Sequence, residues 1–242
     1  MHGHLLKLLV ACCTILLAAL SLGGCGETKK AHYRNSLIDY LYPNVQAPQE
    51  EAVAPVAAGV VLPAKAGIAF APDQVALLSE KDKLELLQRV KKEFARYPAF
   101  TSIELIPSQH LSQGGGFANL EQLRLMYGID LVGLVSYDQM QHTDAGFKTI
   151  SYWTIVGMYM IEGEKNDTNT MMDLSLFHIP SRKMLLHAAG TSQVRKGATY
   201  VNLSEQLRND SLSGFLLATD NMIGNLSIEL DKLQQSAGAV PY

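Results

Sequence analysis

The chain has 242 residues, of which 48% are hydrophobic and 18% are charged, and its net charge is −3 at pH 7. This length and composition suit a globular protein that buries a core, as one domain with extensions or as two small domains. The acidic balance excludes general nucleic-acid binding, which needs a basic surface. We therefore expect no nucleic-acid partner.

Residues 1–24 are predicted to be a signal peptide. Lys7 supplies a short positive segment, and the run from Leu8 to Leu20 is apolar. The run is shorter than the roughly 20 residues of a membrane-spanning helix, and it fits the apolar part of a secretory signal. A buried core helix is the alternative reading, but no polar residues alternate with the apolar ones to give the segment one apolar face.

The segment Leu22-Gly23-Gly24-Cys25 resembles the bacterial lipobox. The resemblance implies signal cleavage between Gly24 and Cys25, with acyl chains such as palmitate attached to Cys25. More than one chain gives a durable membrane anchor. Gly26, rather than aspartate, follows the cysteine. By the sorting rule of such lipoproteins, this implies the bacterial outer membrane, with the protein on the inner leaflet and facing the periplasm.

The cysteine count agrees with this interpretation. The chain has three cysteines, and Cys12 and Cys13 would leave with the leader. Because Cys25 would be acylated, the mature domain would hold no thiol for a disulfide, a nucleophile or a metal site.

Residues 25–65 are expected to form a lipidated N-terminus and a Pro/Ala-rich tether. Prolines at 48, 55 and 63 interrupt any helix between Asn44 and Lys65. The apolar stretch Ser36–Pro43 predicts one or two helical turns that stop at the proline. This stretch either packs as part of the linker, which we favour, or binds a partner.

Residues 66–235 are predicted to be a mixed α/β domain, and residues 236–242 a loose tail. Helices are expected after the capping box Ser79–Asp82, after Gly114–Gly116 (with Leu120, Leu123 and Met126 aligned and Gly128 at its end), and from Asn202–Glu205. Strands are expected at Gly67–Pro72, Thr101–Ile106, Ile129–Val135, Lys148–Ile161, Met171–His178 and Met184–Val194.

The order of these elements predicts the fold class. The early alternation of strands and helices favours parallel pairing, and the later run of strands favours antiparallel hairpins. We therefore expect an α/β (α+β) fold, with a mixed β-sheet of about five to six strands and packed helices. A signal helix and an extended tether would precede it.

Two features could carry chemistry but have simpler readings. The Gly114–Gly116 loop precedes a helix and could hold an anion, yet neither a P-loop nor a dinucleotide fingerprint is present. His178 and His187 flank one predicted hairpin, but no third ligand stands at a metal-site spacing. A flexible loop and surface histidines are favoured, and no metal ligand or cofactor is predicted.

A hydrolase is the remaining enzymatic reading. Asp138 and Asp144 near the end of a strand could act with a histidine, and the candidates after the leader include His110 and His142 as well as His32, His178 and His187. Ser136 lies in Gly-Leu-Val-Ser-Tyr, which lacks the second glycine of a nucleophile elbow. Solvated carboxylates are the favoured interpretation, so no catalytic residue is predicted.

The most hydrophobic body segment is Tyr152–Ile161, which holds the only tryptophan. A core strand is favoured over a strand that joins a partner's sheet or a hairpin that enters a bilayer.

Several segments together resemble the rhombotarget (rhombotail) lipoprotein family. They are Ser36–Pro43, Leu134–Gln139, Tyr152–Gly157, Gly163–Thr168, Ile179–Lys183 and the final helix. The family is associated with rhombosortase, a membrane protease that processes C-terminal GlyGly tails. Residues 237–242 lack such a tail. At the level of fold alone, the chain is also similar to domains of curli-secretion-channel lipoproteins and of lipoprotein activators of peptidoglycan synthases.

The resemblance implies a lipid-anchored, non-enzymatic envelope lipoprotein that acts as a binding or assembly module. Its expected partners are membrane lipid, through Cys25, and an envelope protein or a second copy of the chain. A channel-forming or secretion-accessory lipoprotein is the main alternative, and an unrecognised hydrolase is the other.

Overall fold

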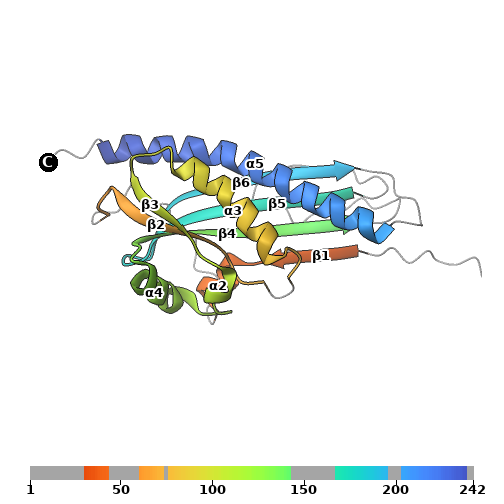
Figure 1. The fold of residues 1–242 in the computed structure, drawn as a ribbon, viewed down its shortest axis with the longest axis horizontal. Coiled ribbons are helices and arrows are strands. Elements are labelled where there is room, and N and C mark those ends of the chain that lie inside the picture. The colour runs from red at the N-terminus through yellow and green to blue at the C-terminus, as the bar shows by residue number, and fades with distance from the viewer. Residues whose placement is uncertain (1–29, 44–59, 74–75, 143–166, 196–202, 239–242) are drawn as a thin grey trace, which may run out of the picture.

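The structure, a computed structural model, describes residues 30–43, 60–73, 76–142, 167–195 and 203–238. These ranges form six strands and four α-helices (Figure 1). The elements are β1 (Lys30–Asn35), α2 (Leu37–Leu41), β2 (Ala64–Phe70), α3 (Glu80–Phe94), β3 (Phe100–Leu105), α4 (Gly116–Tyr127), β4 (Leu131–His142), β5 (Asp167–His178), β6 (Lys183–Arg195) and α5 (Leu203–Gly238).

All six strands belong to one mixed sheet, as predicted. Its order is β3-β2-β4-β5-β6, and β1 also pairs with β4. β2 is parallel to both β3 and β4, whereas β4, β5 and β6 are antiparallel neighbours. β2 pairs with the first half of β4 and β1 with the second half, so these two short strands follow each other along one side of β4.

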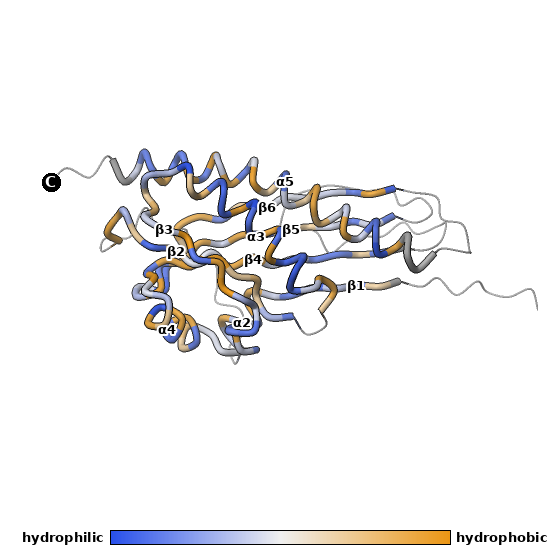
Figure 2. The backbone as a smooth tube through the Cα atoms, in the orientation of Figure 1, coloured by the Kyte–Doolittle hydropathy of each residue, from blue (hydrophilic) through white to orange (hydrophobic). Residues whose placement is uncertain are grey.

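Helices cover both faces of the sheet, and each face has its own core. On one face, α3 and α5 pack on the strands, and the rings of Phe70 and Phe215 both contact Tyr137 edge-on. On the other face, α2 and α4 cover a smaller core that includes Leu120, which is fully buried. The hydropathy of the tube in Figure 2 follows this pattern, with apolar residues gathered along the central strands.

Local signals in the sequence explain how two helices begin and end. The Ser79 hydroxyl accepts a hydrogen bond from the backbone N–H of Asp82, which caps α3 as predicted. Gly128 ends α4 with a φ of 63°, a left-handed conformation that favours glycine. Met126, expected on the buried side of α4, is exposed, while Leu120 and Leu123 are buried.

The first 14 described residues belong to the domain rather than to a tether. Lys30–Asn35 forms β1, and Ser36 caps the short helix α2 at the predicted place. The Asn35 amide donates to the carbonyl of Ala71 at 2.7 Å, which ties β1 to the end of β2. The packed domain therefore includes residues 30–43 and does not begin at residue 66, because an alternating strand precedes the helical turns.

The other end of the chain also differs from the expectation. Helix α5 runs to Gly238, past the predicted start of a loose tail at residue 236. Its predicted apolar face is confirmed at Phe215, Met222 and Leu226, which are fully buried. The leader, Cys25 and the predicted strand Lys148–Ile161 lie outside the described residues.

Candidate functional site

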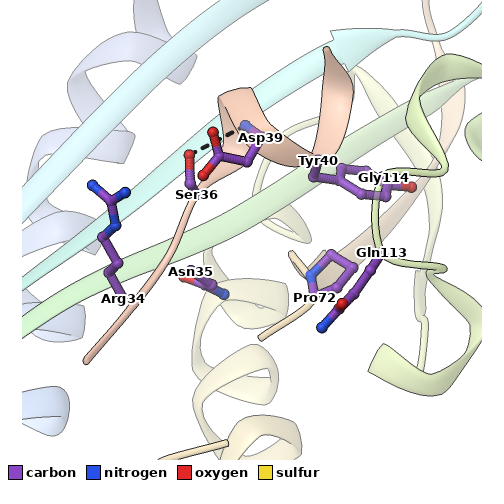
Figure 3. Close-up of a pocket in the computed structure, with 8 residues that line it drawn as sticks. All are labelled: Arg34, Asn35, Ser36, Asp39, Tyr40, Pro72, Gln113 and Gly114. Atoms are coloured by element: carbon purple, nitrogen blue, oxygen red, sulfur yellow. Dashed lines mark hydrogen bonds between the residues drawn. The ribbon is translucent and has the colours of Figure 1, made fainter. Parts of the chain in front are cut away.

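A cavity of about 300 Å³ lies where the β1–α2 turn meets the end of β2 and the loop before α4. Figure 3 shows the side chains that surround it. The lining residues are Arg34, Asn35, Ser36, Asp39, Tyr40, Pro72, Gln113 and Gly114.

The topology places this cavity at a characteristic ligand position. β2 lies between two parallel neighbours: the chain passes through α3 to β3 on one side, then through α4 to β4 on the other. In open α/β sheets, ligands bind beyond the carboxyl end of the strand where the connections diverge in this way. Pro72 stands two residues after the end of β2, so the cavity occupies that crevice.

A buried hydrogen-bond network holds one wall of the cavity. The hydroxyl of Tyr40 donates to Asn119 Oδ1 at 3.0 Å, and burial raises the pKa of this tyrosine. The same oxygen accepts a bond from the Ser112 backbone N–H at 3.0 Å, while the Asn119 amide donates to the His110 carbonyl. These bonds join α2 to α4 and the loop before it.

The glycine triplet contributes close packing to this wall. Gly114 and Gly116 have φ values of 64° and 55°, where other residues are strained. A Cβ on Gly116 would lie 3.0 Å from the carbonyl oxygen of Leu41. The loop that the sequence suggested as an anion holder or a flexible segment therefore brings α4 against α2.

Opposite charges line the cavity without a partner. Neither the Arg34 guanidinium nor the Asp39 carboxylate makes an ion pair or side-chain hydrogen bond in the part of the chain that the structure describes. Two other polar side chains of the lining form hydrogen bonds with the backbone of the protein. Asn35 binds the backbone of Ala71 and Tyr137, and Gln113 Nε2 donates to the carbonyl of Asp73 at 2.8 Å.

A buried charge cluster lies next to the cavity, behind Pro72. Lys83 Nζ lies 2.6 Å from Asp73 Oδ2 and 3.2 Å from Glu80 Oε1. The side chains of Asp73 and Lys83 are only 4% and 6% exposed. Burial acts to raise the pKa of Glu80, but hydrogen bonds from Ser108 and Lys83 outweigh it and lower that pKa. The cluster ties Asp73, which follows β2, to the first turn of α3.

The residues of the hydrolase hypothesis do not meet in this cavity. Asp138 Oδ1 contacts the ring of His32 at 2.8 Å across β1 and β4, and neither residue lines the cavity. His110 contacts the Tyr127 hydroxyl, and His142 stands at the end of β4. Asp144 lies outside the described residues.

The two hairpin histidines do not converge either. His187 contacts Asp173, and that hydrogen bond raises the pKa of its imidazole against the opposing effect of burial. His178 contacts Ser181 at 2.8 Å instead, and burial lowers its pKa. Among the residues that the structure describes, no group of His, Cys, Asp and Glu side chains could hold a metal ion.

Sequence reasoning missed the cavity itself. Its lining comes from residues 34–36, 39–40, 72 and 113–114, three segments that are distant in the sequence and carry no shared motif. The signal that could have indicated it is topological: the end of the first parallel strand is the switch point of the sheet.

Comparisons with known proteins give a distant likeness in fold. No family model and no curated protein match the chain. Twelve chains of solved structures do. A neuraminyllactose-binding hemagglutinin homolog from Helicobacter pylori is 8% identical, covers 81% of this chain and 97% of its own, and has a TM-score of 0.43.

Two further structures are similar to this chain. A PelC dodecamer from Paraburkholderia phytofirmans is 10% identical over 62% of this chain and 87% of that one, with a TM-score of 0.29. Lipoprotein GNA1162 from Neisseria meningitidis is 13% identical over 62% and 96%, with a TM-score of 0.28. At these TM-scores no function is carried over, and the resemblance to rhombotarget lipoproteins stays a prediction.

Proposed function

We propose that the protein is a lipid-anchored envelope lipoprotein of the rhombotarget type, which acts as a non-enzymatic binding or assembly module. Acylated Cys25 would hold it on the inner leaflet of the outer membrane, facing the periplasm. The observation that carries the proposal is the position of β1. This strand begins at Lys30, five residues after the lipobox cysteine.

The short spacing limits how far the domain can stand from the bilayer. An extended residue spans at most about 3.6 Å, so five residues reach about 18 Å. The described residues contain no helix that is long and apolar enough to cross a membrane. Attachment through acyl chains on Cys25 would place the sheet directly beside the lipid surface.

The strand register indicates which end of the sheet would face the bilayer. Lys30 pairs with His142, His142 with Asp167, and Asp167 with Arg195. These four residues form one row across β1, β4, β5 and β6 at the anchored end of the sheet. The cavity begins at the other end of β1, about 17 Å farther along at the usual rise of a strand.

The cavity chemistry favours binding over catalysis. Among the described residues, its lining includes no histidine, cysteine or lysine. The serine in the lining, Ser36, uses its hydroxyl to cap α2. A hydrolytic nucleophile needs a base that hydrogen-bonds to it, and in the described residues the Asp39 carboxylate makes no such bond to the Ser36 hydroxyl.

Metabolic labelling with an alkyne fatty acid tests the anchor. We expect the label on the wild-type chain, and its loss together with release from membranes for Cys25→Ser. Cys12→Ser and Cys13→Ser are matched controls that should stay labelled. Density-gradient separation of the membranes should place the chain with the outer membrane. Label on Cys25→Ser, or an inner-membrane position, would contradict the respective part of the proposal.

Crosslinking in native membranes, followed by identification of the partner, tests the binding role. A crosslinked envelope protein or a second copy of the chain is expected. Light scattering of the detergent-solubilised protein separates the alternatives. A ring-sized oligomer would support the channel-forming alternative, and a strict monomer would remove it.

A further inference from the structure

We infer that the cavity at the end of β2 binds a small zwitterion of the amino-acid or short-peptide class. Arg34 would pair with its carboxylate and Asp39 with its ammonium group. This inference rests on the proposed binding function and adds to it a class of ligand.

The first step is the state of the two charges. Arg34 lies near the end of β1, and Asp39 lies in the first turn of α2, five residues later. Both line the cavity, yet they do not pair with each other or with other described side chains. Charge-assisted hydrogen bonds are the strongest that a side chain makes, so both groups keep their full capacity for a ligand.

The second step is the combination of signs. A simple anion would pair with Arg34 and be repelled by Asp39, and a simple cation would meet the reverse. A molecule with a carboxylate and an ammonium group satisfies both side chains at once. The cavity therefore discriminates in favour of zwitterions.

The third step is the opposite rim. Figure 3 shows Arg34 and Asp39 on one side of the cavity and Gln113 across from them. Gln113 donates through Nε2 to Asp73, which leaves its side-chain oxygen available to accept a bond from a ligand. Between the rims, Pro72 and the ring of Tyr40 supply less polar surface for the body of the ligand.

The fourth step is size and rigidity. A volume of about 300 Å³ is at the small end of ligand pockets, which suits one or two amino-acid units. The bond between Tyr40 and Asn119 fixes the wall before any ligand arrives. A preformed wall lowers the entropic cost of binding.

The experiment is an NMR titration of the purified, full-length mature protein in detergent micelles. L-Alanine and L-alanyl-L-alanine are the zwitterionic probes. N-acetyl-L-alanine carries only the negative charge, and L-alanine methyl ester carries only the positive one. We expect saturable binding of a zwitterion and at least about tenfold weaker binding of both analogues, because each loses one charge-assisted bond.

Variants assign the binding to this cavity. Arg34→Gln and Asp39→Asn should each weaken binding of the zwitterion about tenfold or more, because each removes one charged partner. Both side chains are at the surface, so the fold should persist. Arg208→Gln and Glu85→Gln alter exposed charges on α5 and α3 that have no partner among the described residues, and should leave binding unchanged.

Three results would overturn the inference: no saturable binding of either zwitterion, an analogue that binds as well as its zwitterion, or wild-type binding by both cavity variants. Labelling of Cys25 is measured separately. Failure of the anchor and failure of the ligand site are therefore distinguishable.

Discussion

Asn221 on α5 accepts a hydrogen bond at 3.1 Å from the backbone N–H of Thr191 in β6. One helical turn later, Asn225 donates to the carbonyl of Ala189 at 2.7 Å. Both backbone groups belong to β6, which stands at one end of the described strand order. The helix thereby satisfies two hydrogen-bonding groups of β6 that would otherwise be available to pair with a strand of another chain.

Replacement of both asparagines should leave these two backbone groups of β6 without their side-chain partners. For Asn221→Ala/Asn225→Ala we expect the free energy of unfolding to fall by about 2 kcal/mol, at about 1 kcal/mol per hydrogen bond. Self-association should increase with protein concentration. Urea denaturation and light scattering measure the two effects. Asn209→Ala, a single exposed change on the same helix, measures the gain in helix propensity per substitution and is the reference. Equal stability of the double variant and this reference would contradict the role of the asparagines.

The contact between α5 and β6 depends on a glycine. A Cβ on Gly190 would lie 2.1 Å from the backbone nitrogen of Met222, so Gly190→Ala should push the helix away and cost about 3 kcal/mol or more. Gly224 meets nothing within 4 Å, and Gly224→Ala should instead stabilise by up to about 1 kcal/mol. Thermal denaturation of the two variants checks these opposite signs.

The buried ion pair between Asp73 and Lys83 predicts a non-additive result. Lys83→Met leaves a buried carboxylate without its partner and should cost about 3 to 5 kcal/mol. Addition of Asp73→Leu should recover much of that loss, since the uncompensated charge is gone. Lys81→Met changes an exposed lysine two residues away and should stay within about 0.5 kcal/mol. Denaturant unfolding of the wild type, Lys83→Met, Asp73→Leu and the double variant completes the cycle.

The contact between His187 and Asp173 predicts a pH dependence of stability. The hydrogen bond that His187 donates to the Asp173 carboxylate raises the pKa of His187 above its ordinary value of 6.5. The protonated form is therefore favoured by folding. Its contribution is fully present below pH 6.5 and is lost as the pH rises through the raised folded-state pKa. The stability advantage of wild type over His187→Gln should shrink across that interval.

His178 serves as the contrasting case. Burial lowers its pKa, so folding favours the neutral imidazole. Its contribution is present above pH 6.5 and is lost as the pH falls through the lowered folded-state pKa. The difference between wild type and His178→Gln should therefore change with pH in the opposite direction. NMR titration of both imidazoles gives the two pKa values directly, and values on the same side of 6.5 would contradict the assignment.

Much of the sheet was predictable because its signals are local. The capping box at Ser79 and the left-handed glycine at Gly128 each act within a few residues of the helix ends that they define. The order of elements predicted the change from parallel to antiparallel pairing. The predicted strand ended at Val135 because the rest of β4 is polar. In the structure β4 continues to His142, because its second half is held by pairing with β1 and β5.

β1 was missed for a related reason. In Lys30–Asn35, exposed His32 and Arg34 alternate with half-buried Tyr33 and buried Asn35, but few of these residues are apolar. Its place is fixed by pairing with β4, about a hundred residues away, and by the amide of Asn35. The cavity also joins residues 34–40 to Pro72 and to Gln113 and Gly114, and these distant segments could not be brought together from the sequence.

If Cys25 is acylated as proposed, the four residues between Cys25 and β1 would also decide how the protein meets its partners. With Cys25 acylated, the domain would be confined to a thin shell beside one bilayer. Its encounters there would become a search in two dimensions. A short tether of this kind would raise the effective concentration of any partner in the same membrane, and it would prevent contact with partners farther away. Flexible residues inserted after Cys25 would lengthen the tether, lower this effective concentration and let the domain reach more distant partners.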